Sequence, residues 1–355
     1  MEKTDKWKAV SHLQKCIRRG WSEQIPDVAS ALWSVDNAYL RYRLAVIAVE
    51  DVGIGNIAAV ASLMEDKINK RWVEANGGLD GLIVRMQALA NGIKDRTACT
   101  WGSLASRREF EALHGDWEMA TPAQAGSIAF DNTQTPAVRA AAALRAAGTN
   151  LFPHGGFAEI EGDWDSWIAM NIEHGAPDNV IEAMRKGQKS QKEWHPAFLG
   201  MCWADYRAST LETGVTTPKN FGDVHGYVSA AIDSHTAEGK KAIAQWWKKT
   251  TLLRQQWNAL GWSGTDSEAV SLLSSMVFLL EGGAVDKRLG YATALTVEQT
   301  AKDQWAVGAG MPGREAATAV WRAMPQLHEC RLQYVKSQPA ATLENSIHSF
   351  GENGP

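Results

Sequence analysis

The sequence predicts an all-α protein made of several helical subdomains. Proline and glycine separate segments of roughly ten to twenty residues, and strict alternation of apolar and polar residues is scarce. Hydrophobic residues make up 45% of the 355 residues, and the formal net charge is −4. These values are typical of a globular chain with a substantial core, and they argue against a disordered chain or a wholly basic nucleic-acid coat.

Five helices are predicted at the start of the chain from their terminal residues. Gly20 follows a basic last turn, as a helix-ending glycine does. Asn56 stands where its side chain can cap the fourth helix. The expected ranges are 4–20, 26–36, 38–51, 57–75 and 79–91.

Later helices carry similar signals. Thr135 before Pro136 opens an alanine-rich helix that closes at Gly148. The segments 265–268 and 296–299 both match the capping-box pattern. Breaks rich in glycine and proline suggest three domains and a tail. We expect a domain over 1–115, a middle region over 116–212, a third region over 213–336 and a flexible tail over 337–355.

Cysteine usage and hydropathy indicate a cytoplasmic protein. No CxxC occurs, so neither a disulfide framework nor a zinc knuckle is expected. The N-terminus lacks the apolar core of a signal peptide, and the apolar stretch 269–280 is too short to span a bilayer. We therefore expect no membrane partner, no bound metal and no cofactor. The four cysteines are Cys16, Cys99, Cys202 and Cys330.

The segment 39–56, YLRYRLAVIAVEDVGIGN, has two interpretations. As a helix it has an apolar stripe, and Gly53 ends it. Arg43 and Glu50 then share one side about 10 Å apart, so each needs a partner from another helix. As a strand followed by Gly-x-Gly it imitates a dinucleotide-binding turn. The strand interpretation places two carboxylates where a pyrophosphate would bind, so we favour the helix.

The order KCIRRG, then LRYRLAVIAVEDVGIGN, then a helix resembles the C-terminal region of the RarA/MgsA family of replication-associated ATPases. The resemblance covers about the first 100 residues. It implies an all-helical, clamp-loader-like collar that assembles as a tetramer, with Arg41, Arg43, Glu50 and Asp51 at its contacts. The matching positions are Lys15, Ile17, Arg18, Gly20, Arg41, Arg43, Leu44, Ile47, Ala48, Glu50, Asp51, Val52, Gly53 and Asn56.

Nothing in the sequence matches the ATPase part of that family. No GxxxxGK[ST] motif occurs in the 355 residues, and the nearest similar stretch, 238–241, lacks both the first glycine and the final Ser/Thr. ATP hydrolysis by a P-loop is therefore not expected, and we expect a non-enzymatic role.

Histidine and aspartate residues support an alternative hypothesis, that the protein is an enzyme. His225, Asp233 and His235 could serve as acid/base or metal groups, because carboxylate and imidazole together bind metals and move protons. Their spacing is not the i,i+3 or i,i+4 of a helical metal site, so ordinary helix-terminal histidines are the competing interpretation. His154 and His195 are further candidates, without a nucleophile motif nearby.

The segment 236–260 is predicted as one long helix in which basic residues alternate with tryptophans. Such a surface could bind phosphates and stack on bases, with single strands preferred over duplex DNA. The alternative is an amphipathic helix with its tryptophans in the core. Smaller basic clusters lie at 186–192, beside Trp194, and at 107–108. The proposed DNA-binding residues are Lys240, Lys241, Trp247, Lys248, Lys249 and Arg254.

Three functions remain open from the sequence. The first is a DNA replication or recombination protein that forms a homo-oligomer and binds DNA or a replication protein. The second is an enzyme with an inter-helix site around His225, Asp233 and His235. The third is a viral or mobile-element factor that uses a collar domain to bind host machinery.

Overall fold

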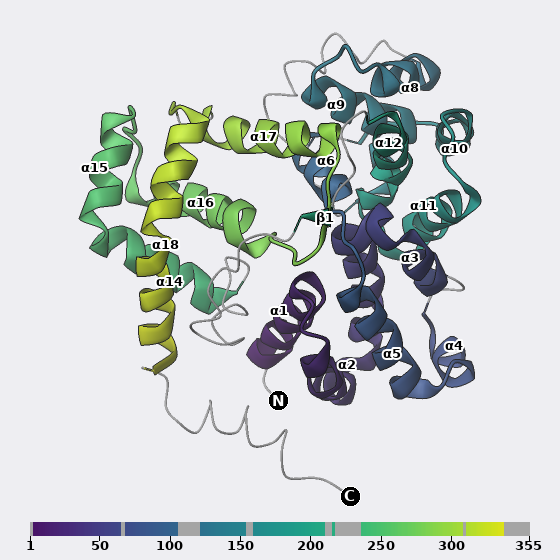
Figure 1. The fold of residues 1–355 in the computed structure, drawn as a ribbon, viewed down its shortest axis with the longest axis horizontal. Helices are drawn as coiled ribbons and strands as arrows, with labels where there is room; N and C mark the ends of the chain where they lie inside the picture. The colour runs from purple at the N-terminus through teal and green to yellow at the C-terminus, as the bar shows by residue number, and fades with distance from the viewer. Residues whose placement is uncertain are drawn as a thin grey trace, which may run out of the picture. The chain divides into compact units, whose positions relative to one another are not determined.

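The computed structural model describes residues 3–64, 68–105, 121–153, 159–209, 215–216, 236–307 and 310–336. Within them the fold is all-α, as predicted (Figure 1). The one sheet among these residues pairs β1 (Val215–Thr216) with β2 (Arg288–Leu289) in antiparallel fashion.

The chain divides into two compact units that interleave along the sequence. Unit 1 comprises 1–37, 218–284 and 302–355, and unit 2 comprises 38–217 and 285–301. The expected domain boundaries at 115 and 212 stay predictions, since the described residues end at 105 and 209 near them.

Unit 1 is built from three separate parts of the chain. Its core packs α14 against α16 and α18, and the buried residues include Trp246, Trp257, Leu273 and Val320. Its elements are α1 (Lys3–Arg19), the 3₁₀ turn η1 (Ser22–Gln24), the first part of α2 (Ile25–Ile47), α14 (Ala237–Lys249), α15 (Thr251–Ala259), α16 (Asp266–Val277), the π-helical turn η7 (Phe278–Gly282), the end of α17 (Ala292–Val307) and α18 (Gly313–Lys336).

Unit 2 contains the middle of the chain. Its core includes Leu44, Trp101, Trp167 and Phe198, and the rings of Trp101 and Phe198 stack with centroids 6.4 Å apart. Besides the rest of α2, the start of α17 and the two strands, its elements are the π-helical turn η2 (Ala48–Val52), the 3₁₀ turns η3 (Gly53–Asn56) and η5 (Thr149–Leu151), α3 (Ile57–Met64), α4 (Lys70–Ala75), α5 (Gly78–Asn91), α6 (Thr97–Ala105), α8 (Pro122–Phe130), α9 (Pro136–Ala147), α10 (Trp164–Glu173), α11 (Asp178–Gln191) and α12 (His195–Ala208).

Several predicted helix ends are confirmed. Gly20 has a φ of 70°, so it ends α1 in the left-handed conformation. Thr135 caps α9, and Gly148 ends it. The capping box at Thr265 and Glu268 opens α16. These ends depend on residues within one turn, which is why the sequence predicted them.

Three other predicted boundaries are wrong. The helix expected over 57–75 is α3 and then a separate α4, which Asn69 caps through a hydrogen bond from Trp72 N. The capping box expected at 296–299 lies inside α17. The helix expected over 236–260 breaks at Thr250, whose ψ of 80° is not helical. In the last case a buried threonine interrupts an otherwise continuous amphipathic pattern.

One described segment, Ser22–Met64, is long and apolar enough to cross a membrane by composition. It is 72% buried within the protein over the scored window, as the core helix of a soluble protein is, so this is weak evidence of a membrane span.

Candidate functional site

The end of α2 has an unusual local structure. The helix passes into the π-helical turn η2, and Gly53 then takes a φ of 48°. Single π-helical turns are rare and often occur at functional sites. The helical interpretation of 39–56 is thereby confirmed, and no strand precedes Gly53 within residues 3–52.

The two glycines are explained by a close approach of backbone. A Cβ on Gly53 would lie 2.5 Å from the carbonyl oxygen of Asp95, and a Cβ on Gly55 would lie 2.7 Å from that of Ile93. Asp95 N also donates a hydrogen bond of 3.0 Å to Val52 O. The Gly-x-Gly therefore makes room for the segment that leads into α6, rather than for a phosphate.

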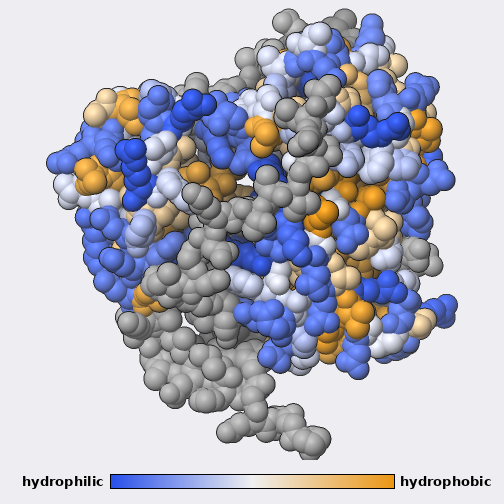
Figure 2. Space-filling view, viewed as in Figure 1, coloured by the Kyte–Doolittle hydropathy of each residue, from blue (hydrophilic) through white to orange (hydrophobic). Residues whose placement is uncertain are grey.

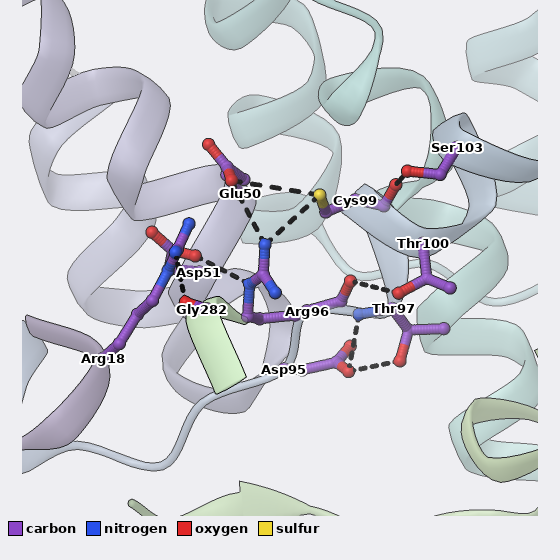
Figure 3. Close-up of polar contacts among 10 residues, drawn as sticks. All are labelled: Arg18, Glu50, Asp51, Asp95, Arg96, Thr97, Cys99, Thr100, Ser103 and Gly282. Atoms are coloured by element: carbon purple, nitrogen blue, oxygen red, sulfur yellow. Dashed lines mark hydrogen bonds and ion pairs between the residues drawn. The ribbon is translucent and has the colours of Figure 1, made fainter. Parts of the chain in front are cut away.

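Beside these glycines lies a cluster of four side chains, which we call the Arg96 cluster: Glu50, Asp51, Arg96 and Cys99. Arg96 Nε donates to Asp51 Oδ1 at 2.8 Å, and its Nη2 donates to Glu50 Oε1 at 3.2 Å (Figure 3). The same Nη2 lies 3.4 Å from Cys99 Sγ. One guanidinium thus pairs with both carboxylates of the η2 turn.

Burial makes these contacts important for stability. The side chain of Asp51 is fully buried, and those of Glu50 and Arg96 are 12% and 13% exposed. Burial by itself lowers the pKa of Arg96, but Cys99, Asp51 and Glu50 outweigh it and raise that pKa above its ordinary value. The guanidinium therefore stays charged, and the cluster holds one cation between two carboxylates.

His195, the first residue of α12, is buried in the same unit. Desolvation lowers its pKa to about 4; the nearby Glu50 and Asp51 oppose that shift, and Arg96 and Arg43 reinforce it. Its Nδ1 makes no hydrogen bond within the part of the chain that the structure describes. His195 is therefore a neutral core histidine near pH 7. A pKa of about 4 makes its imidazole a weak general base at that pH.

We expect His195 to make the protein sensitive to acid. Its pKa is lower in the folded state than in the unfolded chain, so the unfolded chain binds the proton first and stability falls as pH drops from 6.5 towards 4. A shift of this size corresponds to about 3 kcal/mol. Urea unfolding across this range should show a shallower pH dependence for His195→Asn than for the wild type. Parallel curves for the two proteins would contradict this assignment.

A second buried network in unit 2 lies around Asp95. Its Oδ1 accepts hydrogen bonds from Thr97 N at 3.1 Å and from Thr97 Oγ1 at 2.5 Å, and its Oδ2 accepts one from Tyr291 Oη at 3.3 Å. Burial raises the pKa of Asp95 above its ordinary value. These bonds position the start of α6 and connect it to the chain just after β2, so the network stabilises the unit.

Lys94, next to Asp95, is fully buried. Its Nζ donates to Ala90 O at 2.6 Å, to Gly92 O at 2.9 Å and to Asp286 Oδ1 at 2.5 Å. Its backbone pairs with that of Lys287 and Leu289. The ammonium group thus caps the C-terminal carbonyls of α5 and joins them to the strand segment at β2.

Unit 1 has its own buried ion cluster at the η7 turn. Glu281 accepts from Arg331 Nη1 at 2.7 Å and contacts His328 Nε2 at 2.8 Å. Burial alone raises the pKa of Glu281, but Arg331 and His328 outweigh it and hold that pKa well below its ordinary range. Arg18 Nη1 donates to Gly282 O at 2.7 Å, so α1 is tied to the same turn.

The basic side chains of α14 lie on one face of that helix. Lys240, Lys241, Lys248 and Lys249 are all exposed, and we call these four residues the α14 basic face. They span about 13 Å along the helix and about half of its circumference. Lys249 Nζ also donates to Gln333 Oε1 of α18 at 2.9 Å.

The tryptophans of this segment lie on the opposite face and belong to the core. Trp246 and Trp257 are fully buried, and Trp247 is 3% exposed. Trp247 Nε1 also donates to Asp266 Oδ1 at 2.7 Å. The ring of Trp247 therefore offers no face to a nucleic-acid base, so the assignment of Trp247 to stacking is not supported by this geometry.

The residues assigned to oligomer contacts have partners within the chain. Glu50 and Asp51 pair with Arg96, and Arg41 Nη1 donates to Ile68 O at 2.9 Å. Asp51 has no exposed surface to present to another subunit. Arg43 is partly exposed. These contacts match the inter-helix role that the sequence allowed for this segment.

The structure describes only some of the other residues that the sequence proposed for a site. His225, Asp233 and His235 lie outside the described residues, as do His154 and the pair at 107–108. Lys186 pairs with Glu182 one turn earlier on α11. Arg254 is partly exposed on α15. Among the described residues, no group of three or more His, Cys, Asp or Glu side chains could hold a metal ion.

Four basic side chains with little exposed surface form ion pairs that the sequence did not indicate: Lys94, Arg96, Arg139 and Arg331. Arg139 pairs with Asp205 Oδ1 at 2.8 Å. A usable signal existed for two of them, since the charged triplet at 94–96 stands between two apolar helices. A charge in such a place must find a partner when it is buried.

Comparisons with protein-family models, with curated proteins and with solved structures find no match to this chain.

Proposed function

We propose that this protein binds DNA without enzymatic activity, through the α14 basic face, and acts in replication or recombination. The observation that carries the proposal is the positive charge of α14 and α15 in unit 1. Segment 237–259 contains four lysines and one arginine against one glutamate, in a chain whose net charge is −4. Such a local excess of positive charge attracts polyanions.

The tertiary structure supports the proposal because it exposes the lysines. The apolar side of α14 packs against α16 and α18, which directs Lys240, Lys241, Lys248 and Lys249 outward. Hydrophilic side chains predominate over the part of unit 1 where α14 and α15 lie (Figure 2). Exposed lysines can approach a phosphate backbone without rearrangement of the core.

The link to replication rests on the resemblance to the RarA/MgsA family in the first 100 residues. The same resemblance underlies our proposal that the chain assembles as a homo-oligomer, with four subunits as in that family. A replication protein as partner is the alternative to DNA for the same surface. The enzyme hypothesis rests on His225, Asp233 and His235, and no described residue adds to it.

Charge reversal on α14 should abolish most of the binding. We expect the wild type to bind a labelled duplex with a single-stranded overhang at low salt, and Lys248→Glu/Lys249→Glu to bind at least about tenfold more weakly. Fluorescence anisotropy measures both. The matched control is Lys70→Glu/Arg71→Glu, which changes the same number of exposed charges on α4 of unit 2. Absence of binding by the wild type at low salt would contradict the proposed function.

A further inference from the structure

The tryptophans that are buried beneath the α14 basic face bear on the kind of DNA that this face can bind. Proteins that bind single strands combine a positively charged groove with aromatic rings on which bases stack, and each stacked base contributes about 1–3 kcal/mol. In α14 and α15 the three tryptophans Trp246, Trp247 and Trp257 are at most 3% exposed. The exposed surfaces of α14 and α15 thus offer ammonium groups without a tryptophan ring beside them.

We infer that the α14 basic face binds the phosphate backbone of duplex DNA, in a way that does not depend on base sequence, in preference to single strands. This inference rests on the proposed function and names its ligand class. A duplex carries one charge per about 1.7 Å of its axis, roughly twice the linear density of one strand. When recognition depends on charge alone, the ligand with the denser charge binds more tightly.

The arrangement of the lysines fits a rigid polyanion. The α14 helix packs against α16 and α18, so the positions of its lysines are held by the core of unit 1. Four ammonium groups over about 13 Å can reach phosphates on one side of a duplex together. A flexible single strand would have to be ordered along the helix, and no stacking would offset that loss of entropy.

Acidic side chains lie in both helices that pack against α14. Asp266 and Glu268, in the first turn of α16, lie in the helix that packs against α14, and Asp266 is hydrogen-bonded to Trp247. Glu329 of α18 is exposed near Cys330 and Lys249. These carboxylates repel phosphate, so we expect α16 and α18 to add no phosphate contact to those of the four lysines.

The inference predicts a measurable salt dependence. Four phosphate contacts correspond to a slope of log K against log salt of about −3.6 for duplex DNA and about −2.8 for a single strand. When both lines are extrapolated from a common affinity at about 1 M salt, the duplex binds about tenfold more tightly at about 50 mM. Anisotropy with a labelled duplex of about 20 base pairs, and with one of its strands alone, tests this between about 50 and 200 mM salt.

Neutralising variants connect the effect to α14. Lys248→Gln/Lys249→Gln should reduce the duplex slope by about 1.8, and the matched Lys70→Gln/Arg71→Gln should leave it unchanged. We expect both variants to fold, because all four side chains are exposed. Circular dichroism and thermal melting test this.

The outcomes separate the two proposals. Tighter binding of the single strand than of the duplex would overturn the inference and leave the proposed function standing. No binding of either DNA by the wild type would overturn the proposed function and the inference with it. Duplex binding with a slope that Lys240→Gln/Lys241→Gln and Lys248→Gln/Lys249→Gln both leave unchanged would overturn the assignment to α14.

Discussion

Replacing Arg96 with methionine is expected to cost about 3–5 kcal/mol of unfolding free energy, because it removes the cation that pairs with two carboxylates of low exposure. Asp51 is fully buried and Glu50 is 12% exposed, so water cannot fully solvate either charge. Methionine keeps much of the length of the arginine side chain, which limits the loss of packing. Urea unfolding followed by tryptophan fluorescence measures the change.

Two further variants show whether charge is the cause. Arg71→Met removes an exposed arginine of α4 and should change stability by at most about 0.5 kcal/mol. Adding Glu50→Gln and Asp51→Asn to Arg96→Met should restore part of the lost stability, because the two side chains that paired with Arg96 are then neutral. A loss under about 1 kcal/mol for Arg96→Met alone would show that the Arg96 cluster is not a stabilising ion pair.

Glu281→Gln is expected to destabilise unit 1 by about 3–5 kcal/mol near pH 7, because Arg331 then stays buried without a charge partner. Arg331 is 1% exposed and donates to Glu281 Oε2. Glutamine has nearly the same shape, so the change tests charge more than packing. Glu315→Gln, at an exposed position of α18, is the matched control and should be close to neutral.

The effect of Glu281 should also depend on pH in a definite direction. Arg331 and His328 hold the folded-state pKa of Glu281 well below its ordinary value, against the effect of burial. The unfolded chain therefore takes up the proton first as pH falls, and the contribution of Glu281 is present above about pH 4.5 and lost below it. Chemical unfolding at several pH values should show the wild type and Glu281→Gln converging in acid. A constant difference between them down to about pH 2 would contradict this account.

The helical nature of the chain could be predicted because its signals are local. Thr265 accepts a bond from Glu268 N, and Gly148 ends α9, through interactions within one turn of helix. The helices predicted over 57–75 and 236–260 are each interrupted in the structure, although the apolar pattern gives no sign of a break. At Thr250 the tertiary packing sets a non-helical ψ, and the apolar pattern continues across the break.

The candidate site was predictable only in part. The sequence indicated that Arg43 and Glu50 need partners from other helices, and Glu50 does have one. It did not indicate that the partner is Arg96, which lies 46 residues away. The assignment of tryptophan to a stacking surface failed because an amphipathic helix with lysines and tryptophans is consistent with either face being the exposed one.

The sequence by itself determined the class of fold, most helix ends and the net charge of segment 237–259, because these depend on neighbouring residues and on composition. Only the tertiary structure decided what the Gly-x-Gly accommodates, which basic residue neutralises Glu50 and Asp51, and which side of α14 meets solvent. Each of these depends on backbone or side chains that are distant in sequence and approach one another only when the core closes. The same packing that buries the tryptophans exposes the lysines, and that exposure supports DNA binding as the proposed function.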